Sequence, residues 1–473
     1  MSAVGKRTLT VVDGGGKSPP PTGGGGEGDL APWRKNLVLN RDHRIEGSLH
    51  NVQLILENDE RLAGVFWLDE FANQILLHRD PPWAGGNRHE FTDQDGCELA
   101  AWLQHPGNYG MAVKDDLAMK AVYIVARRHR RHPPREYLRA LKWDGVKRAE
   151  GALVRIFGAE DNEYSRAASL CWLVSAVARI LIVDPVVPAL GAQVDFMLVL
   201  EGEQGKSKTS TTRALFGAPW HVEIKESPAN TDFFMLLRGA WCVEIAELQS
   251  FRGADVTAVK AAVSRRTDKY RAPYERTVRA WRRECVFVGT TNESEYLTDP
   301  TGARRFLPVQ CRPDATIDIE LARADRDQIW AEAVHLLDGG FKYWDLPKDA
   351  QEEQEKRYIE DSWESVLRMW LLGKDDRENA YPDPLQFGRA VPNVRMADAM
   401  LWALGVDLAK QTKPDQRRFG DVMKHLGWVT EQKVWERGKP KERRWRAKDP
   451  DGADRQMGAS ASDIGGEWDD VPF

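Results

Sequence analysis

The chain has 473 residues, a formal net charge of −5, 42% hydrophobic residues and 29% charged residues. This is the composition of a soluble globular protein that is long enough for about two to four domains. The slightly acidic total argues against a protein that binds nucleic acid through its overall charge, so any such binding must come from local basic clusters.

Neither the cysteines nor the apolar segments indicate a secreted or membrane protein. The five cysteines form no C-x-x-C pair, so they predict buried thiols in a reducing compartment rather than a zinc site or a disulfide framework. The longest apolar region, residues 167–187, is interrupted by Arg179 and Asp184 and predicts a buried helix rather than a membrane span. We therefore expect a cytoplasmic protein with no membrane partner. The cysteines are Cys97, Cys171, Cys242, Cys285 and Cys311.

The N-terminal third of the chain contains two different kinds of segment. Residues 1–30 are rich in Gly and Pro and predict a disordered tail, because they cannot bury enough apolar surface to offset their ordering entropy. Residues 31–140 mix helix and strand signals and predict an α/β accessory region. Its last part, residues 117–140, predicts a helix up to Pro133. The basic cluster at 127–132 is either a solvated helix end or a phosphate-contacting patch.

The central segment, residues 141–345, alternates helical stretches with apolar strands. We expect strands at 196–200, 241–246 and 285–290, each of which ends in polar residues. Strands separated by helices predict an α/β fold with a mostly parallel sheet and helices on both faces. Ligands of such sheets bind at the carboxyl ends of the strands.

The segment 346–447 predicts a separate C-terminal module. Residues 351–370 predict an amphipathic helix, residues 394–404 and 414–426 predict two short helices, and residues 428–445 predict a hairpin. This order is typical of a winged-helix DNA-binding module, although a small helical cap with a solvated hairpin would have the same pattern. The last residues, 448–473, predict a second disordered tail.

A glycine-rich loop follows the first predicted strand, and a helical stretch follows the loop. Backbone N–H groups and the helix N-terminus would face phosphates, Lys208 would reach the β/γ-phosphates, and the Thr209 hydroxyl would bind Mg²⁺. Ser207 stands where G-x-x-x-x-G-K-[ST] has its second glycine, and a serine holds this turn if its φ is negative. The loop therefore predicts ATP and Mg²⁺ as cofactors. The predicted nucleotide-binding residues are Gly202, Glu203, Gln204, Gly205, Lys206, Ser207, Lys208, Thr209 and Ser210.

Two acidic residues mark the end of the second predicted strand. We expect Glu247 to orient the attacking water and Glu244 to be the second acid, with Thr209, Glu244 and Glu247 as the metal ligands. Residues three apart on a strand point to opposite faces unless the chain bends at Ala246. The alternative for either acid is a structural salt bridge.

The third predicted strand and the segment after it supply three further candidates. Asn292 could contact the γ-phosphate or the nucleophilic water, or it could cap a turn. Arg304 and Arg305 follow a turn, and one of them could stabilise transition-state charge from the same or a neighbouring subunit while the other braces the fold. A surface ion pair is the alternative for both.

Residues 264–284 carry basic and aromatic residues on one connection between strands. Cations for phosphates and rings for bases suit a sequence-tolerant grip on a single nucleic-acid strand. An intersubunit or core-packing hairpin is the alternative. The predicted nucleic-acid contacts are Arg265, Arg266, Lys269, Tyr270 and Arg271.

Taken together, these motifs resemble the virulence-associated protein E family of phage, prophage and genomic-island proteins, which is related to superfamily 3 helicases and mobile-element primase-helicases. The resemblance runs from roughly Trp33 to Trp344 and depends on many ordered motifs. They include residues 132–138, 143–145, 200–205, 243–248, 268–274, 290–292, 296–299, 301–309 and 326–333.

The resemblance implies a P-loop NTPase core of the AAA+ or superfamily 3 helicase type, a homo-oligomeric ring that we expect to be a hexamer, and a role in replicating mobile DNA. It supports Lys208 and Thr209 for nucleotide and Mg²⁺, Glu247 as catalytic acid, Asn292 as sensor, and Arg304 or Arg305 as finger. Two departures are Ser207 in the loop and Gln193 where the family often has a basic residue.

The sequence therefore predicts an ATP-hydrolysing, ring-forming motor that acts on single-stranded or forked DNA in phage or prophage replication. A different class of protein fits the same residues: a nucleotide-gated DNA-binding or initiator protein with little unwinding.

Overall fold

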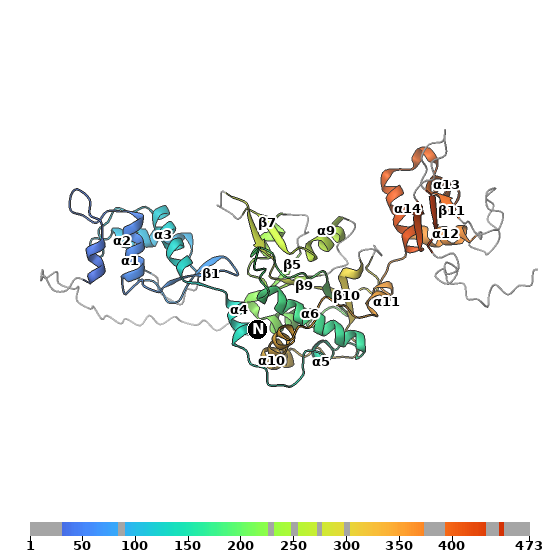
Figure 1. Cartoon of the computed structure of the whole chain (residues 1–473), viewed down its shortest axis with the longest axis horizontal. Helices are drawn as coiled ribbons and strands as arrows, with labels where there is room; N and C mark the ends of the chain where they lie inside the picture. The colour runs from blue at the N-terminus through green and yellow to red at the C-terminus, as the bar shows by residue number, and fades with distance from the viewer. Residues whose placement is uncertain are drawn as a thin grey trace, which may run out of the picture. The chain divides into compact units, whose positions relative to one another are not determined.

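The structure is a computed structural model (Figure 1) that divides into two units, residues 1–68 with 74–130 and residues 69–73 with 131–473. Apart from Lys448, the tails predicted at 1–30 and 448–473 lie outside the described residues. The described residues are 31–83, 90–225, 231–246, 254–271, 277–297, 303–372, 393–431 and 444–448.

The first unit is a mixed α/β assembly, as the sequence predicts for residues 31–140. Its helices α1, α2 and α3 pack around a core that includes Val52, Leu99 and Val122. A short 3₁₀ helix, η1, precedes them, and strands β1, β2 and β3 form a sheet in the order β2-β1-β3. The bounds are η1 Pro32–Asn36, α1 Leu49–Asn58, β1 Phe66–Asp69, β2 Gln74–Leu77, α2 Asp93–Gln104, α3 Asp115–Arg128 and β3 Arg130–Arg131.

The helix that the sequence predicts up to Pro133 ends five residues earlier, and a second helix begins at Pro133. Helix α3 ends at Arg128, and α4 (Pro133–Ala140) begins with the two prolines, whose missing N–H groups cost nothing in a first turn. His132 caps α4 and is buried. Arg131 pairs with Glu136. This part of the basic cluster therefore serves the local structure, and a phosphate-contacting patch is the weaker interpretation.

The second unit is built on a parallel five-stranded sheet in the order β10-β4-β9-β6-β5. The three predicted strands are confirmed to within a few residues, whereas β5 and β10 were not predicted. Strand β10 contains Pro308, which an edge strand tolerates because one side of it makes no ladder hydrogen bonds. The bounds are β4 Met197–Glu201, β5 His221–Ile224, β6 Cys242–Ile245, β9 Val286–Thr291 and β10 Phe306–Gln310.

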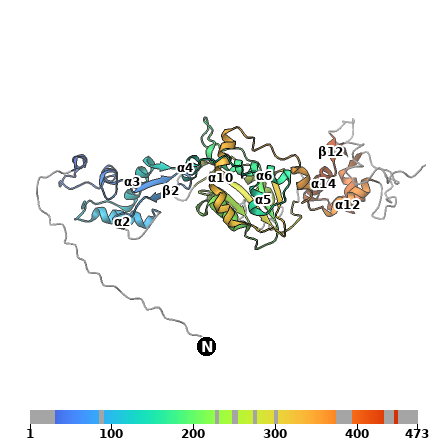
Figure 2. The same ribbon diagram turned by 90° about the horizontal axis from the view of Figure 1, so that it is seen from below.

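Helices cover both faces of this sheet. Successive side chains of β4 point alternately to the two faces, so each face presents apolar residues to a layer of helices. Leu198 and Leu200 pack in the cluster that contains the apolar sides of α5, α6 and α10, which lie together in Figure 2. Met197 and Val199 face the opposite cluster, which includes residues of α8 and α9. The helices are α5 Ala152–Phe157, α6 Glu163–Leu181, α7 Lys208–Phe216, α8 Thr231–Leu236, α9 Ala254–Val263 and α10 Ile319–Asp338.

The C-terminal module combines helices with an antiparallel sheet in the order β11-β13-β12. The predicted hairpin is confirmed by the pairing of β12 with β13, but the single helix predicted at 351–370 is wrong, because it is divided into α11 and α12. Phe419 and Trp445 pack in the module's core. The bounds are α11 Ala350–Glu355, α12 Ser362–Leu371, β11 Asn393–Arg395, α13 Met396–Trp402, η5 Leu408–Lys410, α14 Lys413–His425, β12 Trp428–Glu431 and β13 Arg444–Ala447.

Helix α6 is buried as predicted, and none of the described helices is both long and apolar enough to cross a membrane. All five cysteines are free thiols; four are buried and Cys97 is exposed.

Arg179, the charged residue within the apolar sequence of α6, is itself buried and donates to four backbone carbonyls. Its Nη1 reaches Ala192 (2.8 Å) and Arg265 (3.1 Å), and its Nη2 reaches Val194 (3.0 Å) and Val263 (3.2 Å). Arg179 thus fastens the C-terminus of α9 to the segment before β4.

Replacing Arg179 by methionine keeps much of the packing but leaves these carbonyls without donors. We expect the free energy of unfolding to fall by about 3 kcal/mol, measured by urea denaturation followed through tryptophan fluorescence. The matched control is Arg166→Met on the same helix, because Arg166 is exposed and its ion pair is with the exposed Asp161. Equal stability of the two variants would contradict the role assigned to Arg179.

Candidate functional site

A cavity of about 400 Å³ opens at the carboxyl ends of β4, β6 and β9. Eight of the nine predicted nucleotide-binding residues line it, and the ninth, Glu203, does not. Asn292 lines the same cavity, so the predicted loop and the predicted sensor come together. The sequence missed Glu223, Ala246, Thr290 and Thr291, which also line it.

The loop between β4 and α7 is held close to the end of β9. The Gly202 N–H donates to the Thr291 carbonyl over 3.0 Å. Gly202 has φ +144°, and a Cβ at this position would lie 3.3 Å from the Cys311 carbonyl oxygen. Gly205 has φ +85°. Glycine is therefore required at both positions for the conformation of the loop.

Ser207 departs from the expectation of a negative φ. Its φ is +63° and its ψ is 20°, which is the left-handed conformation that a glycine adopts without cost. Ser207 is the N-cap of α7, and its side chain makes no capping hydrogen bond. The hydroxyl thus offers the helix no compensation for the backbone strain.

Lys208 begins α7 and lies across the loop. Its Nζ donates to the carbonyls of Gly202 (2.7 Å) and Glu203 (2.9 Å). Burial lowers the pKa of the Lys208 ammonium group. Lys206, in contrast, binds the Pro313 carbonyl and lies 3.2 Å from a Glu203 carboxylate oxygen. Of the two lysines, Lys208 is therefore the one placed to exchange loop carbonyls for an anion in the cavity.

Thr209 and Glu244 meet directly beside the cavity. The Thr209 hydroxyl donates to Glu244 Oε1 over 2.5 Å, and Glu244 is fully buried at the end of β6. No group of three or more His, Cys, Asp or Glu that could hold a metal occurs among the described residues. A hydroxyl and one carboxylate suit Mg²⁺, which keeps several waters and takes further oxygens from substrate phosphates.

The remaining predicted catalytic acid, Glu247, lies outside the described residues, which stop at Ala246 in this region. Asn292 follows β9 directly, at the strand end where the sequence predicts it. Glu223 is an exposed acid on β5 and pairs in register with Glu244. Its strand is short and half polar, so the sequence pattern gave no signal for it.

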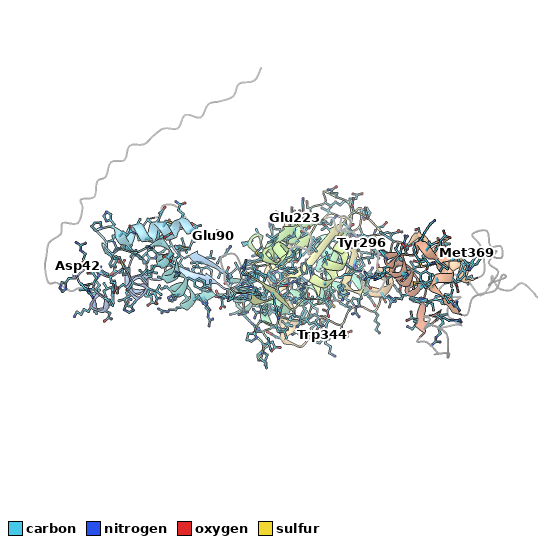
Figure 3. The ribbon with its side chains drawn as sticks, turned by 90° about the horizontal axis from the view of Figure 1, so that it is seen from above. Asp42, Glu90, Glu223, Tyr296, Trp344 and Met369 are labelled. Carbon is cyan, nitrogen blue, oxygen red and sulfur yellow. The ribbon has the colours of Figure 1, made fainter. Side chains whose placement is uncertain are left out.

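Arg304 and Arg305 lie at the amino-terminal ends of the strands, whereas the loop lies at their carboxyl ends. They form part of η4 (Ala303–Arg305), directly before β10, whose first residue pairs with the first residue of β4. Both line a second cavity of about 710 Å³, together with Gln193 and Trp344. Figure 3 shows Trp344 and Glu223, from the two cavities, on opposite sides of this unit.

A strand of five residues is about 16 Å long, so the structure does not bring the arginines to the loop of the same chain. Arg305 Nε donates to Ser264 Oγ over 2.9 Å, which fits the bracing role. Arg304 is exposed. Of the two alternatives for the finger, this position favours action from a neighbouring subunit over action within the same chain.

The predicted nucleic-acid segment contains the antiparallel hairpin of β7 (Thr267–Tyr270) and β8 (Arg279–Arg282). Lys269 and Arg271 are exposed, as a phosphate contact requires. Arg265 is also exposed and stacks over Phe234, whereas Arg266 Nε donates to the Gly191 carbonyl. These contacts leave three of the four basic candidates open to solvent.

Tyr270 departs from the prediction, because its ring is buried and stacks on Trp281 with centroids 6.1 Å apart. Arg283, at the foot of the same hairpin, is buried and forms a bidentate pair with Asp268. For these aromatic and buried charged residues, the alternative of a core-packing hairpin is the better description.

A buried ionic network, which the sequence did not predict, holds the strand before the loop. Arg357 donates to both oxygens of Glu201 (Nε–Oε1 and Nη2–Oε2, both 2.9 Å), and the Tyr296 hydroxyl donates to Glu201 Oε1 over 2.8 Å. Burial opposes the charge of Arg357, but the hydrogen bonds and charge of Glu201 raise its pKa overall. The partners are 156 residues apart, so no local pattern could reveal them.

The sheet and the strand–loop–helix unit define an α/β protein with a candidate anion-binding loop at the carboxyl edge of parallel strands. Residues 138–362 match the family model of the virulence-associated protein E-like domain. This segment therefore matches the family that its motifs predicted.

The solved structures that the chain matches include two apo structures of the C-terminal region of NrS-1. The A form is 12% identical with a TM-score of 0.44, over 85% of this chain and 99% of that chain. The other is 12% identical with a TM-score of 0.45, over 81% of this chain and 95% of that chain. No curated protein matches the chain.

Replacing Ser207 by glycine should relieve the left-handed strain in the loop. We expect a gain of about 1 kcal/mol in the stability of the second unit, seen as a higher midpoint of thermal denaturation. Ser207→Val is the opposite variant, because a β-branched residue is poorly accommodated at this φ, and it should lower the midpoint. A lower midpoint for the glycine variant would contradict the assigned conformation.

Proposed function

We propose that the chain is an ATP-hydrolysing, ring-forming DNA motor of the helicase-like type that acts in phage or prophage replication in the host cytoplasm. The observation that carries the proposal is the contact between Thr209 and Glu244 beside Lys208. A hydroxyl and an ammonium group at a helix N-terminus, with a buried carboxylate from a neighbouring strand, are the donor set of a P-loop NTPase of the AAA+ or superfamily 3 helicase type.

In this proposal the residues of the loop bind Mg²⁺–ATP and position its phosphates. Lys208 exchanges its loop carbonyls for phosphate oxygens, while Thr209 and Glu244 hold the metal with its waters. When bound, Mg²⁺ neutralises charge that develops on the phosphates. Glu247 orients the attacking water and Asn292 contacts the γ-phosphate.

The position of Arg304 supports action between subunits. It is exposed at the sheet edge opposite the loop, so it completes a nucleotide site only in a neighbouring copy. Repetition of that head-to-tail contact closes a ring, and we propose a homo-hexamer. Gln193, in the same cavity as Arg304, stands where the family often has a basic residue.

Single-stranded or forked DNA is the proposed partner. The exposed side chains of Lys269, Arg271 and Arg265 supply cations near the β7–β8 hairpin. The C-terminal helices and three-stranded antiparallel sheet support a winged-helix module, with exposed Arg444 and Arg446 on β13.

A nucleotide-gated DNA-binding or initiator protein is the second candidate. Left-handed Ser207 favours it, because strained backbone conformations are typical of ligand clamps and switch regions. Strand displacement on a forked duplex separates the two candidates: steady ATP-dependent unwinding supports the motor, and DNA binding that needs nucleotide without unwinding supports the initiator.

Lys208→Ala should abolish most ATP turnover, because the phosphates lose the ammonium group at the loop. We expect a fall of at least about 100-fold, measured as phosphate release with and without single-stranded DNA. Lys206→Ala is the matched control, since Lys206 binds Pro313 and Glu203, and it should retain far more activity. Similar losses in both variants would argue against this assignment.

Mixing two inactive variants tests whether Arg304 acts between subunits. Arg304→Ala retains an intact loop, and Lys208→Ala retains an intact arginine, so a mixed ring contains some complete sites. We expect partial recovery of ATP turnover on mixing, together with a multimer by mass measurement in the presence of nucleotide. A mixture that forms multimers and remains inactive would argue against action in trans.

A further inference from the structure

His221 is a buried histidine that faces the candidate metal ligand Glu244. It begins β5, where it pairs in register with Cys242, and Glu223 pairs with Glu244. Because side chains alternate along a strand, His221, Glu223 and Glu244 share one face of the sheet. The His221 side chain is fully buried, and its Nε2 lies 2.9 Å from Glu244 Oε2.

The environment of the ring fixes which nitrogen carries the proton. A carboxylate can only accept hydrogen bonds, so Nε2 must be the donor to Glu244. The other nitrogen, Nδ1, is buried and has no hydrogen-bond partner. An unprotonated Nδ1 leaves only a lone pair unsatisfied, whereas a protonated one would bury an unpaired donor. The ring is thus placed as a donor to Glu244 through Nε2.

The two oxygens of Glu244 are held from different elements. Thr209 of α7 donates to Oε1, and His221 of β5 donates to Oε2. The Thr209 hydroxyl belongs to the loop and is itself a proposed metal ligand, so its hydrogen bond to Glu244 is exchanged when the site is loaded. The bond from His221 does not depend on the loop and remains in either case.

We propose that His221 is a positioning residue that fixes the Glu244 carboxylate and thereby sets the affinity of the site for the divalent cation of a bound nucleotide. This inference rests on the proposed function of the loop. Hydrogen-bond partners behind a metal-binding carboxylate typically change metal affinity 10–100-fold.

Direct metal binding by His221 is the weaker interpretation. Its Nε2 is already hydrogen-bonded to Glu244, and its Nδ1 is buried away from solvent. No cluster of three possible protein ligands includes it among the described residues. His221 therefore acts on the cation through Glu244.

The test is the binding of a fluorescent ATP analogue, titrated with Mg²⁺, to the full chain and its variants. His221→Phe removes the donor at similar size, and we expect about a 10–100-fold higher Mg²⁺ concentration at half-maximal binding. Binding of the analogue in EDTA should stay unchanged. His221→Gln keeps an N–H donor of similar reach and should recover most of the affinity for Mg²⁺.

Two further variants separate positioning from loss of stability. Ile224→Val, at the buried far end of β5, perturbs the same strand without touching Glu244, and its Mg²⁺ dependence should equal that of the wild type. His221→Asn withdraws the donor from Oε2 while keeping a polar group, and it replaces the phenylalanine variant if that protein does not fold. Electron paramagnetic resonance of bound Mn²⁺ should give the same ranking.

The outcomes distinguish this inference from the proposed function. If the wild type binds the analogue with Mg²⁺ and both His221→Phe and His221→Asn keep its Mg²⁺ dependence, the positioning role is overturned while the nucleotide site stands. If the wild type shows no metal-dependent binding of the analogue, both are overturned.

Discussion

The register of three parallel strands is the constraint on which the candidate site depends. Glu201, the last residue of β4, pairs with Thr291 at the end of β9, and Ile245 at the end of β6 pairs with Gly289. Slippage of one strand by one residue would turn its side chains to the other face of the sheet. The register therefore places the loop, Glu244 and Asn292 at one edge before any side chain interacts.

Buried charges then hold that edge in place. Glu201 is clamped by Arg357 and Tyr296 immediately before the loop, and Glu244 is held by Thr209 and His221. A buried charge is costly unless it is paired or hydrogen-bonded, so each carboxylate tolerates few alternative positions. In the proposed function, only the side chains of the loop, Lys208 and Thr209, therefore exchange hydrogen-bond partners when nucleotide binds.

Sequence reasoning reached the parts of this arrangement that local pattern encodes. Apolar runs predict β4, β6 and β9, and the glycines and lysines of the loop predict the anion site. Strand β5 is short and half polar and β10 contains Pro308, so neither has a strand signature. His221 lies on the unpredicted β5, and the Glu201–Arg357 pair spans 156 residues, so both depend on tertiary structure. The sign of φ at Ser207 likewise comes from the geometry of the loop rather than from the residue type.

The sheet topology also bears on the alternative that the sequence left open for the arginines, which is action in the same or in a neighbouring subunit. Sequence order puts Arg304 after the last strand end, but β10 begins there, and its parallel pairing with β4 carries the arginine to the opposite edge. A parallel sheet thus separates the two ends of its strands by the strand length, which is why the proposed function assigns Arg304 to the site of a neighbouring copy.

A crystal structure with Mg²⁺ and a non-hydrolysable ATP analogue tests the central claim most directly. The account predicts the triphosphate within the loop of residues 202–210, with Lys208 Nζ moved from the carbonyls of Gly202 and Glu203 to phosphate oxygens. An analogue bound elsewhere, with Lys208 still on those carbonyls, would contradict it.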